Sequence, residues 1–193
     1  MAVSYSLSFV RAALVQESVL VAQTYRDDPS WDNVRAAVRH DNLLQARTVT
    51  SGNRIFSEIH KRLSLLNAEQ IELMAEANDQ DVRQLIWIAI CKQYAFIRDF
   101  THEILVPAHT SSRWEVGNDE YVYFFNSKAE WHPELERISD KSRSNARQTL
   151  FLMMRQCGLL NETNQLVPQM VSSALQNCSS ESDLALIPGA IRL

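Results

Sequence analysis

The longest helix-periodic segment of the chain, residues 79–105, places the strongest constraint on the fold. It reads DQDVRQLIWIAICKQYAFIRDFTHEIL, and its apolar residues recur at the three- and four-residue spacings of a buried helix. Its longest unbroken apolar run, Leu85–Ile90, has six residues, whereas a helix that spans a membrane needs about 20. We therefore expect a central core helix that ends before Pro107, in a protein without membrane contact.

The composition favours a helical, cytoplasmic protein. Only four glycines and five prolines occur among 193 residues, and a sheet fold with many tight turns uses more of both. Cys91, Cys157 and Cys178 have no metal-binding or redox spacing. We therefore expect buried free thiols at Cys91 and Cys157, no disulfide framework, no metal and no cofactor.

The pattern predicts an all-α globular fold with two helical parts and a tail. Residues 1–106 form the N-terminal part, residues 107–171 the C-terminal part, and the Ser-rich residues 172–193 an aperiodic tail. Gly158 ends the last long helix, and the following LLNETNQLVP is typical of a small two-stranded β wing. Periodicity and cap residues predict the other helices, at about residues 8–25, 31–40, 51–63, 67–77, 119–131 and 141–157.

Two segments share one architecture, in which a short helix and a turn precede a helix that opens with small polar and basic residues. This is the pattern of a helix-turn-helix, whose second helix reads bases in the DNA major groove. Arg and Lys pair with guanine, and Asn pairs with adenine. The candidate DNA-binding residues of the first block are Arg35, Arg39, Arg47, Ser51, Asn53, Arg54, Ser57 and Lys61. Those of the second block are Lys141, Arg143, Ser144, Asn145, Arg147, Gln148 and Arg155.

The charges of the chain cluster at these two blocks. Residues 31–63 hold six Lys/Arg and three Asp/Glu, and residues 137–155 hold five and one, although the whole chain has a net charge of −4. A basic patch on an acidic body is typical of a nucleic-acid-binding surface. Amphipathic helices also direct Arg and Lys toward solvent as a matter of routine, and this alternative stays open.

No pattern in the chain indicates catalysis. The segment THEIL begins like a zinc motif, but Val106 stands where the second histidine would be. No Gly-rich phosphate loop is present, and we expect no enzymatic activity. A group of aromatic residues at helical spacing is read as core rather than as a base-stacking surface: Tyr121, Tyr123, Phe124, Phe125 and Trp131.

Four motifs, YSLSF, DNLLQART, FNSKAEWHPEL and ARQTLFLMMRQCGLL, make residues 4–171 resemble the BrxA family. Members of this family are small components of bacteriophage-exclusion (BREX) systems. The resemblance implies a cytoplasmic, all-helical protein that binds double-stranded DNA without catalysis. It also implies work beside the methyltransferase and ATPase components of a phage-defence system.

The resulting hypothesis is a monomeric, non-enzymatic DNA-binding accessory protein, and two alternatives stay open. One is a protein-interaction scaffold whose basic faces meet acidic partners. The other is RNA binding, because the BrxA family has been compared with the NusB fold. The acids of FNSKAEWHPEL would repel phosphate, so we interpret that segment as a junction between the two halves or as a partner surface.

Overall fold

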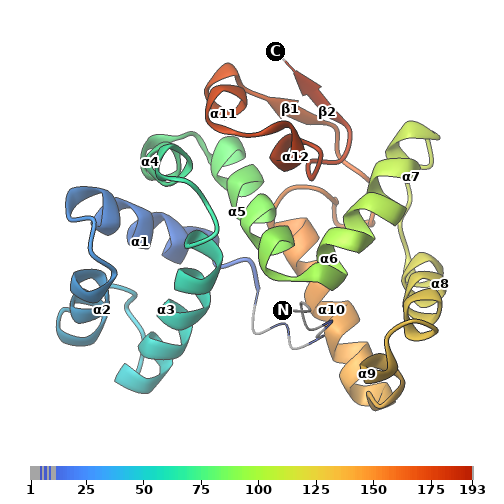
Figure 1. Cartoon of the computed structure of the whole chain (residues 1–193), viewed down its shortest axis with the longest axis horizontal. Helices are drawn as coiled ribbons and strands as arrows, with labels where there is room; N and C mark the ends of the chain where they lie inside the picture. Colours follow the sequence, from blue (N-terminus) through green and yellow to red (C-terminus); the bar gives the residue numbers. More distant parts are fainter. Residues whose placement is uncertain (1–4, 6, 8, 10–11, 193) are drawn as a thin grey trace.

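The computed structural model describes residues 5, 7, 9 and 12–192, and this part of the chain is predominantly helical (Figure 1). The all-α prediction is confirmed. The first four helices lie on one side of the central helix α5 (Asp79–Gln93). They are α1 (Val15–Asp27), α2 (Trp31–His40), α3 (Val49–Leu63) and α4 (Ala68–Glu76).

The second half of the chain continues from α5 toward the opposite side of the molecule (Figure 1). Its elements are α6 (Ala95–Phe100), the π-helical turn η1 (Thr101–Leu105), α7 (Val106–Thr110), α8 (Asn118–Ala129), α9 (Pro133–Glu136) and α10 (Asp140–Gln156). The C-terminal elements then fold back over the end of α5. They are β1 (Gln169–Val171), α11 (Ser173–Cys178), α12 (Glu181–Leu184) and β2 (Ala190–Arg192).

Helix α5 is buried on all sides, as its sequence predicts: every residue from Gln84 to Cys91 is inaccessible to solvent or nearly so. The helix ends earlier than expected, because Tyr94 adopts an extended backbone. Beyond that break, helical structure continues past Pro107 to Thr110, so the predicted stop at Pro107 is wrong. Pro107 lies in the first turn of α7, where a residue without an N–H is tolerated.

Local capping signals place most of the helix boundaries. Ser30, Asn67 and Ser139 each accept a hydrogen bond from a backbone N–H in the first turn of α2, α4 and α10, respectively. Gly158, with a φ of 72°, follows the end of α10 as predicted. Helix α1 begins at Val15 rather than near residue 8, which lies outside the described residues.

The prediction of an aperiodic tail at residues 172–193 is wrong. Leu175, Leu184 and Leu186 are buried in this segment, and Trp87 in α5 donates a 3.0 Å hydrogen bond from Nε1 to the Leu186 carbonyl. Strand β2 pairs in parallel with β1. Elements as short as α11, α12 and β2 show no sequence period, because none is long enough to repeat one.

A buried carboxylate fastens α12 to α4 and α5. Lys92 Nζ lies 2.8 Å from Asp183 Oδ1, and Gln70 Nε2 donates a 3.1 Å hydrogen bond to Oδ2. Burial alone would raise the pKa of Asp183, but the hydrogen bonds from Lys92 and Gln70 outweigh it and hold this pKa below its usual value.

Asp183→Asn is therefore expected to destabilise the protein in a pH-dependent way. At neutral pH the loss should be about 1–3 kcal/mol, as for a hydrogen bond to a charged group. Because the folded pKa is depressed, the contribution is complete above the unfolded pKa of about 4 and disappears as the pH falls through the folded value. Urea unfolding of both proteins between pH 7 and pH 3 measures this difference. A gap that stayed constant with pH would contradict the assignment.

A buried ion pair lies inside α3. Arg62 and Glu58 are 1% and 3% exposed, and Arg62 Nε donates to Glu58 Oε1 at 3.1 Å. Arg62 Nη1 donates to the carbonyls of Ala12 and Ala13, each at 3.1 Å. The Tyr94 hydroxyl also donates to Glu58, and burial together with this bond raises the pKa of Tyr94 to about 12. The segment before α1 is thus tied to α3.

In the part of the chain that the structure describes, no helix combines the length and the apolar character needed to cross a membrane.

Candidate nucleic-acid interface

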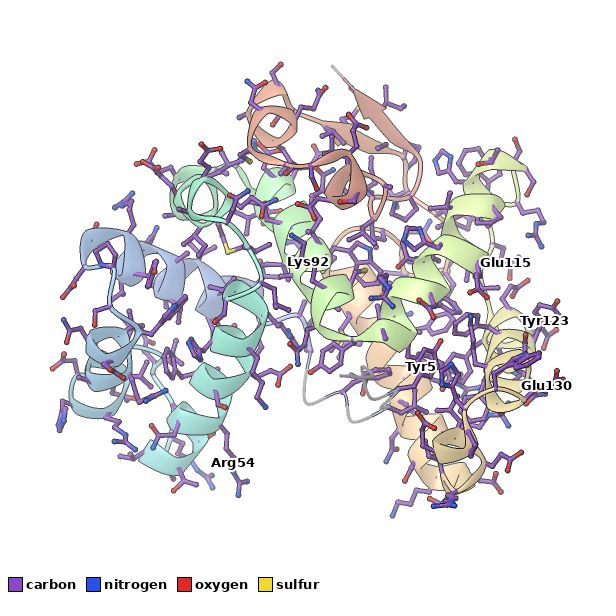
Figure 2. The ribbon with its side chains drawn as sticks, in the orientation of Figure 1. Tyr5, Arg54, Lys92, Glu115, Tyr123 and Glu130 are labelled. Atoms are coloured by element: carbon purple, nitrogen blue, oxygen red, sulfur yellow. The ribbon has the colours of Figure 1, made fainter. Side chains whose placement is uncertain are left out.

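The first basic block consists of α2, the loop 41–48 and α3. Its predicted contact residues are accessible, with Ser51 and Asn53 half-buried and the others exposed. The exposed ones are Arg35, Arg39, Arg47, Arg54, Ser57 and Lys61. Figure 2 shows the side chain of Arg54 projecting outward from the lower part of α3. Among the described residues, the side chains of Arg47, Arg54 and Lys61 have no ion pair and no hydrogen bond.

Two further arginines of this block are held in place. Arg39 Nε donates to Asn53 Oδ1 at 3.2 Å, and Arg35 lies 3.4 Å from Asp32. Arg62, which adds to the basic count of the sequence, is instead buried against Glu58. Arg62 and Glu58 both lie in the core and carry opposite charges, so the pair adds nothing to the net charge of the exposed face.

The second basic block lies on α10, where three arginines are held by asparagine side chains. The partners come from α8 and from the turn 161–165. Arg143 Nη2 donates to Asn126 Oδ1 at 2.9 Å, Arg155 Nη1 donates to Asn164 Oδ1 at 2.7 Å, and Arg147 Nη1 donates to Asn118 Oδ1. An amide oxygen is a neutral acceptor, so each guanidinium is positioned and keeps its full positive charge.

Three arginines elsewhere in the described chain are neutralised by acids, whereas Arg113 bonds only to the Ser111 hydroxyl. Arg26 pairs with Asp27 and Glu76, Arg83 with Asp79, and Arg98 with Asp99. The contrast sets apart the three arginines of α10, which have asparagine partners, whereas Arg35 of the first block pairs with Asp32. Ordered and uncompensated guanidinium groups are suited to binding an external anion.

Arg147 and Arg155 face a groove of about 530 Å³ on one side of α10. Both of their asparagine partners line it, together with Gln148, which is exposed, and two apolar side chains. The full lining is Asn118, Arg147, Gln148, Phe151, Leu152, Arg155 and Asn164. The predicted wing forms one wall of this groove. It is reduced to a tight turn with one internal antiparallel bridge, Leu160↔Leu166, and a second one from Gln165 to Glu115. Asn164 lies in the turn with a φ of 58°.

The structure does not bring all the predicted residues together. Arg147, Gln148 and Arg155 line the same groove. Ser144 lines a neighbouring hollow with Arg143 and Arg147, nearer the start of α10. Asn145 faces a different hollow, which it lines with Tyr5. Lys141 is exposed at the start of α10 and has no partner within the described residues. Asn118, Asn126 and Asn164 are missing from the predicted set, because no local pattern links them to α10.

The helix pairs differ from a compact helix-turn-helix. The loop between α2 and α3 spans residues 41–48, and α9 is only a single turn of four residues. Helices α3 and α10 nevertheless both begin at the lower edge of the molecule as drawn in Figure 1. Their N-terminal turns, which carry Ser51, Asn53, Lys141, Arg143 and Ser144, therefore lie toward one edge of the fold in this view.

The fold and the groove define a class: an all-helical protein in which asparagines order three arginines of α10, none of which forms an ion pair within the described residues. Comparison with known proteins then assigns the chain to a family. The BrxA family model matches residues 3–183, so the chain belongs to the BrxA family, as its motifs suggest.

One relative is the BREX protein BrxA of Escherichia coli O9:H4 (strain HS), which is 22% identical over 181 residues. That match covers 90% of this chain and 84% of the relative. A crystal structure of an uncharacterized protein from Magnetospirillum magneticum is also similar, with a TM-score of 0.75 and 15% identity. The match covers 92% of the present chain and 94% of the Magnetospirillum chain. At 15% identity, this likeness shows a shared fold only.

Proposed function

We propose that this protein binds double-stranded DNA through the basic faces of α3 and α10. In this proposal it acts in the cytoplasm as a monomeric, non-enzymatic component of a BREX phage-defence system, beside the methyltransferase and ATPase components. One observation carries the proposal: asparagines hold Arg143, Arg147 and Arg155, so that α10 presents three ordered positive charges, none of them in an ion pair within the described residues. Membership in the BrxA family supports the phage-defence context.

The spacing along α10 favours a duplex. Arg147 and Arg155 are eight residues apart, which corresponds to about 12 Å along a helix with a rise of 1.5 Å per residue. The major groove of B-form DNA is about 12 Å wide. The backbone positions of the two arginines are therefore about one major-groove width apart along α10, which suits contacts with phosphates on opposite sides of that groove. Gln148 is exposed on the same face, where a glutamine can pair with adenine.

A competition experiment separates DNA from RNA. A labelled 20-base-pair DNA duplex bound to the protein is challenged with unlabelled duplex DNA, duplex RNA or single-stranded RNA of the same length. The narrow, deep major groove of A-form RNA does not admit a helix. We therefore expect DNA to compete best, and equal or stronger competition by RNA would overturn the duplex-DNA assignment. Absence of DNA binding by the folded protein would instead favour basic faces that meet an acidic protein partner.

A further inference from the structure

Helix α8 presents an outward face that no part of the described chain covers. Its inner side is buried through Tyr121, Phe124 and Phe125. The opposite side carries exposed residues at helical spacing, and these are Asp119, Tyr123, Asn126 and Glu130. Among them, Asn126 has a structural role, because it accepts the hydrogen bond from Arg143. The side chains of the other three have no hydrogen bond and no ion pair within the described residues.

Two aromatic side chains, one on this face and one just past the end of α8, are unusually exposed. Tyr123 is 72% exposed and Trp131, just past the end of α8, is 80% exposed, the two highest values among the exposed large hydrophobic residues of the described chain. The sequence pattern predicts both as core, and for these two residues that prediction is wrong. An exposed tryptophan and tyrosine are the residue types that dominate binding energy at protein interfaces.

Exposed carboxylates occur close in sequence to the two aromatic residues. Figure 2 shows Glu115, Tyr123 and Glu130 along the same outer edge of the molecule. Within the described residues, the side chains of Glu115, Asp119 and Glu130 have no ion pair and no hydrogen bond. We call this set, Glu115, Asp119, Tyr123, Glu130 and Trp131, the α8 acidic–aromatic face.

Other residues of the FNSKAEWHPEL segment have contacts that hold the fold together and do not involve this face. Lys128 pairs with Glu103 and lies 3.7 Å from Asp99, while the His132 ring stacks on Tyr5 at a centroid distance of 3.7 Å. These contacts join α8 and α9 to α6, η1 and the N-terminal segment. Glu130 and Trp131 lie between Lys128 and His132 in sequence and are both directed to solvent.

We propose that the α8 acidic–aromatic face binds an arginine- or lysine-rich segment of another protein. Charge complementarity selects the occupant: three unpaired carboxylates attract a cationic chain, and the faces of Tyr123 and Trp131 can each accept a guanidinium or ammonium group. The same carboxylates repel nucleic-acid phosphates. Because Asn118 at the start of α8 lines the α10 groove, a partner held here would lie beside that groove without occupying it.

The test uses a fluorescein-labelled octapeptide of alternating Arg and Gly, titrated with the full-length protein and followed by fluorescence anisotropy. Wild-type protein is expected to bind it, and a Gly–Ser peptide of equal length is expected not to bind. Tyr123→Ala/Trp131→Ala should weaken binding by roughly 3- to 30-fold, as for the loss of two cation–π contacts. Glu115→Gln/Glu130→Gln should weaken it and reduce its salt sensitivity. The matched control is Glu69→Gln/Glu72→Gln, which removes two exposed acids from α4.

Each outcome is decisive, provided that the variants have the same melting temperature as the wild-type protein. Selective loss in the two α8 variants supports it. Unchanged affinity in Tyr123→Ala/Trp131→Ala, or equal weakening in the α4 control, would mean that the peptide senses only the net charge of the protein and would overturn the proposal. If sedimentation depends on protein concentration and Tyr123→Ala/Trp131→Ala removes that dependence, the face binds a second copy of this chain instead. Duplex binding should be unchanged in the aromatic variant, so a failure here is distinct from a failure of DNA binding.

Discussion

Arg147→Ala/Arg155→Ala is expected to weaken duplex binding by about 10- to 100-fold at low salt. Each substitution removes one positive charge that a neighbouring asparagine holds in place and no acid neutralises. If each arginine contacts one phosphate, the slope of log K against log salt should become shallower by roughly 2, since each phosphate contributes about 0.9. Fluorescence anisotropy of a labelled duplex measures both quantities.

Two controls separate this effect from a change in net charge or a local rearrangement. Arg26→Ala/Arg98→Ala also removes two positive charges, but carboxylates pair with both arginines, so DNA affinity should change little. Asn118→Ala keeps every charge and frees Arg147, so affinity should fall by a few-fold through lost side-chain order, with an unchanged salt slope. Equal losses in the Arg26/Arg98 control would show that binding follows net charge rather than the groove of α10.

The largest effect on stability is expected from Arg62→Ala. The substitution leaves Glu58 buried without its partner, together with the carbonyls of Ala12 and Ala13 that Arg62 bridges. Removal of one member of a buried ion pair typically costs about 3–5 kcal/mol. A small domain has a total stability of about 5–15 kcal/mol, so this loss is a large fraction of it. Urea unfolding at neutral pH measures the change.

A paired replacement tests the physical cause of that loss. Glu58→Leu/Arg62→Met removes both charges and fills the volume with apolar atoms, so it should be less destabilising than Arg62→Ala alone. If the double variant were as unstable as the single one, packing and the lost backbone hydrogen bonds, rather than an unpaired buried charge, would account for the effect.

Local chemistry made much of the fold predictable. Ser30, Asn67 and Ser139 mark helix starts because a side-chain acceptor next to an apolar period is a short-range signal. Gly158 marks a helix end because glycine readily adopts the positive φ, here 72°, that follows a helix. The continuation past Pro107 could not be predicted from these signals. It depends on the π-helical turn η1, in which the Val106 N–H bonds to the Thr101 carbonyl.

The candidate interface was predictable only in part, because its ordering contacts are long-range. Charge spacing identified α3 and α10, but Arg147 and its partner Asn118 are 29 residues apart, and Arg143 and Asn126 are 17 apart. The burial of Arg62 likewise depends on carbonyls about 50 residues away. Trp131 illustrates the opposite error, since an aromatic residue at core spacing proved to be the most exposed large hydrophobic residue of the described chain.

The most direct test of the central claim is the salt dependence of duplex binding by the wild-type protein. A labelled 20-base-pair duplex is titrated at several salt concentrations, and log K is plotted against log salt. Neutralisation of four to six phosphates by α3 and α10 predicts a slope of about −4 to −5. No detectable binding at low salt by a protein that melts cooperatively would contradict the DNA-binding account and leave the basic faces to a protein partner.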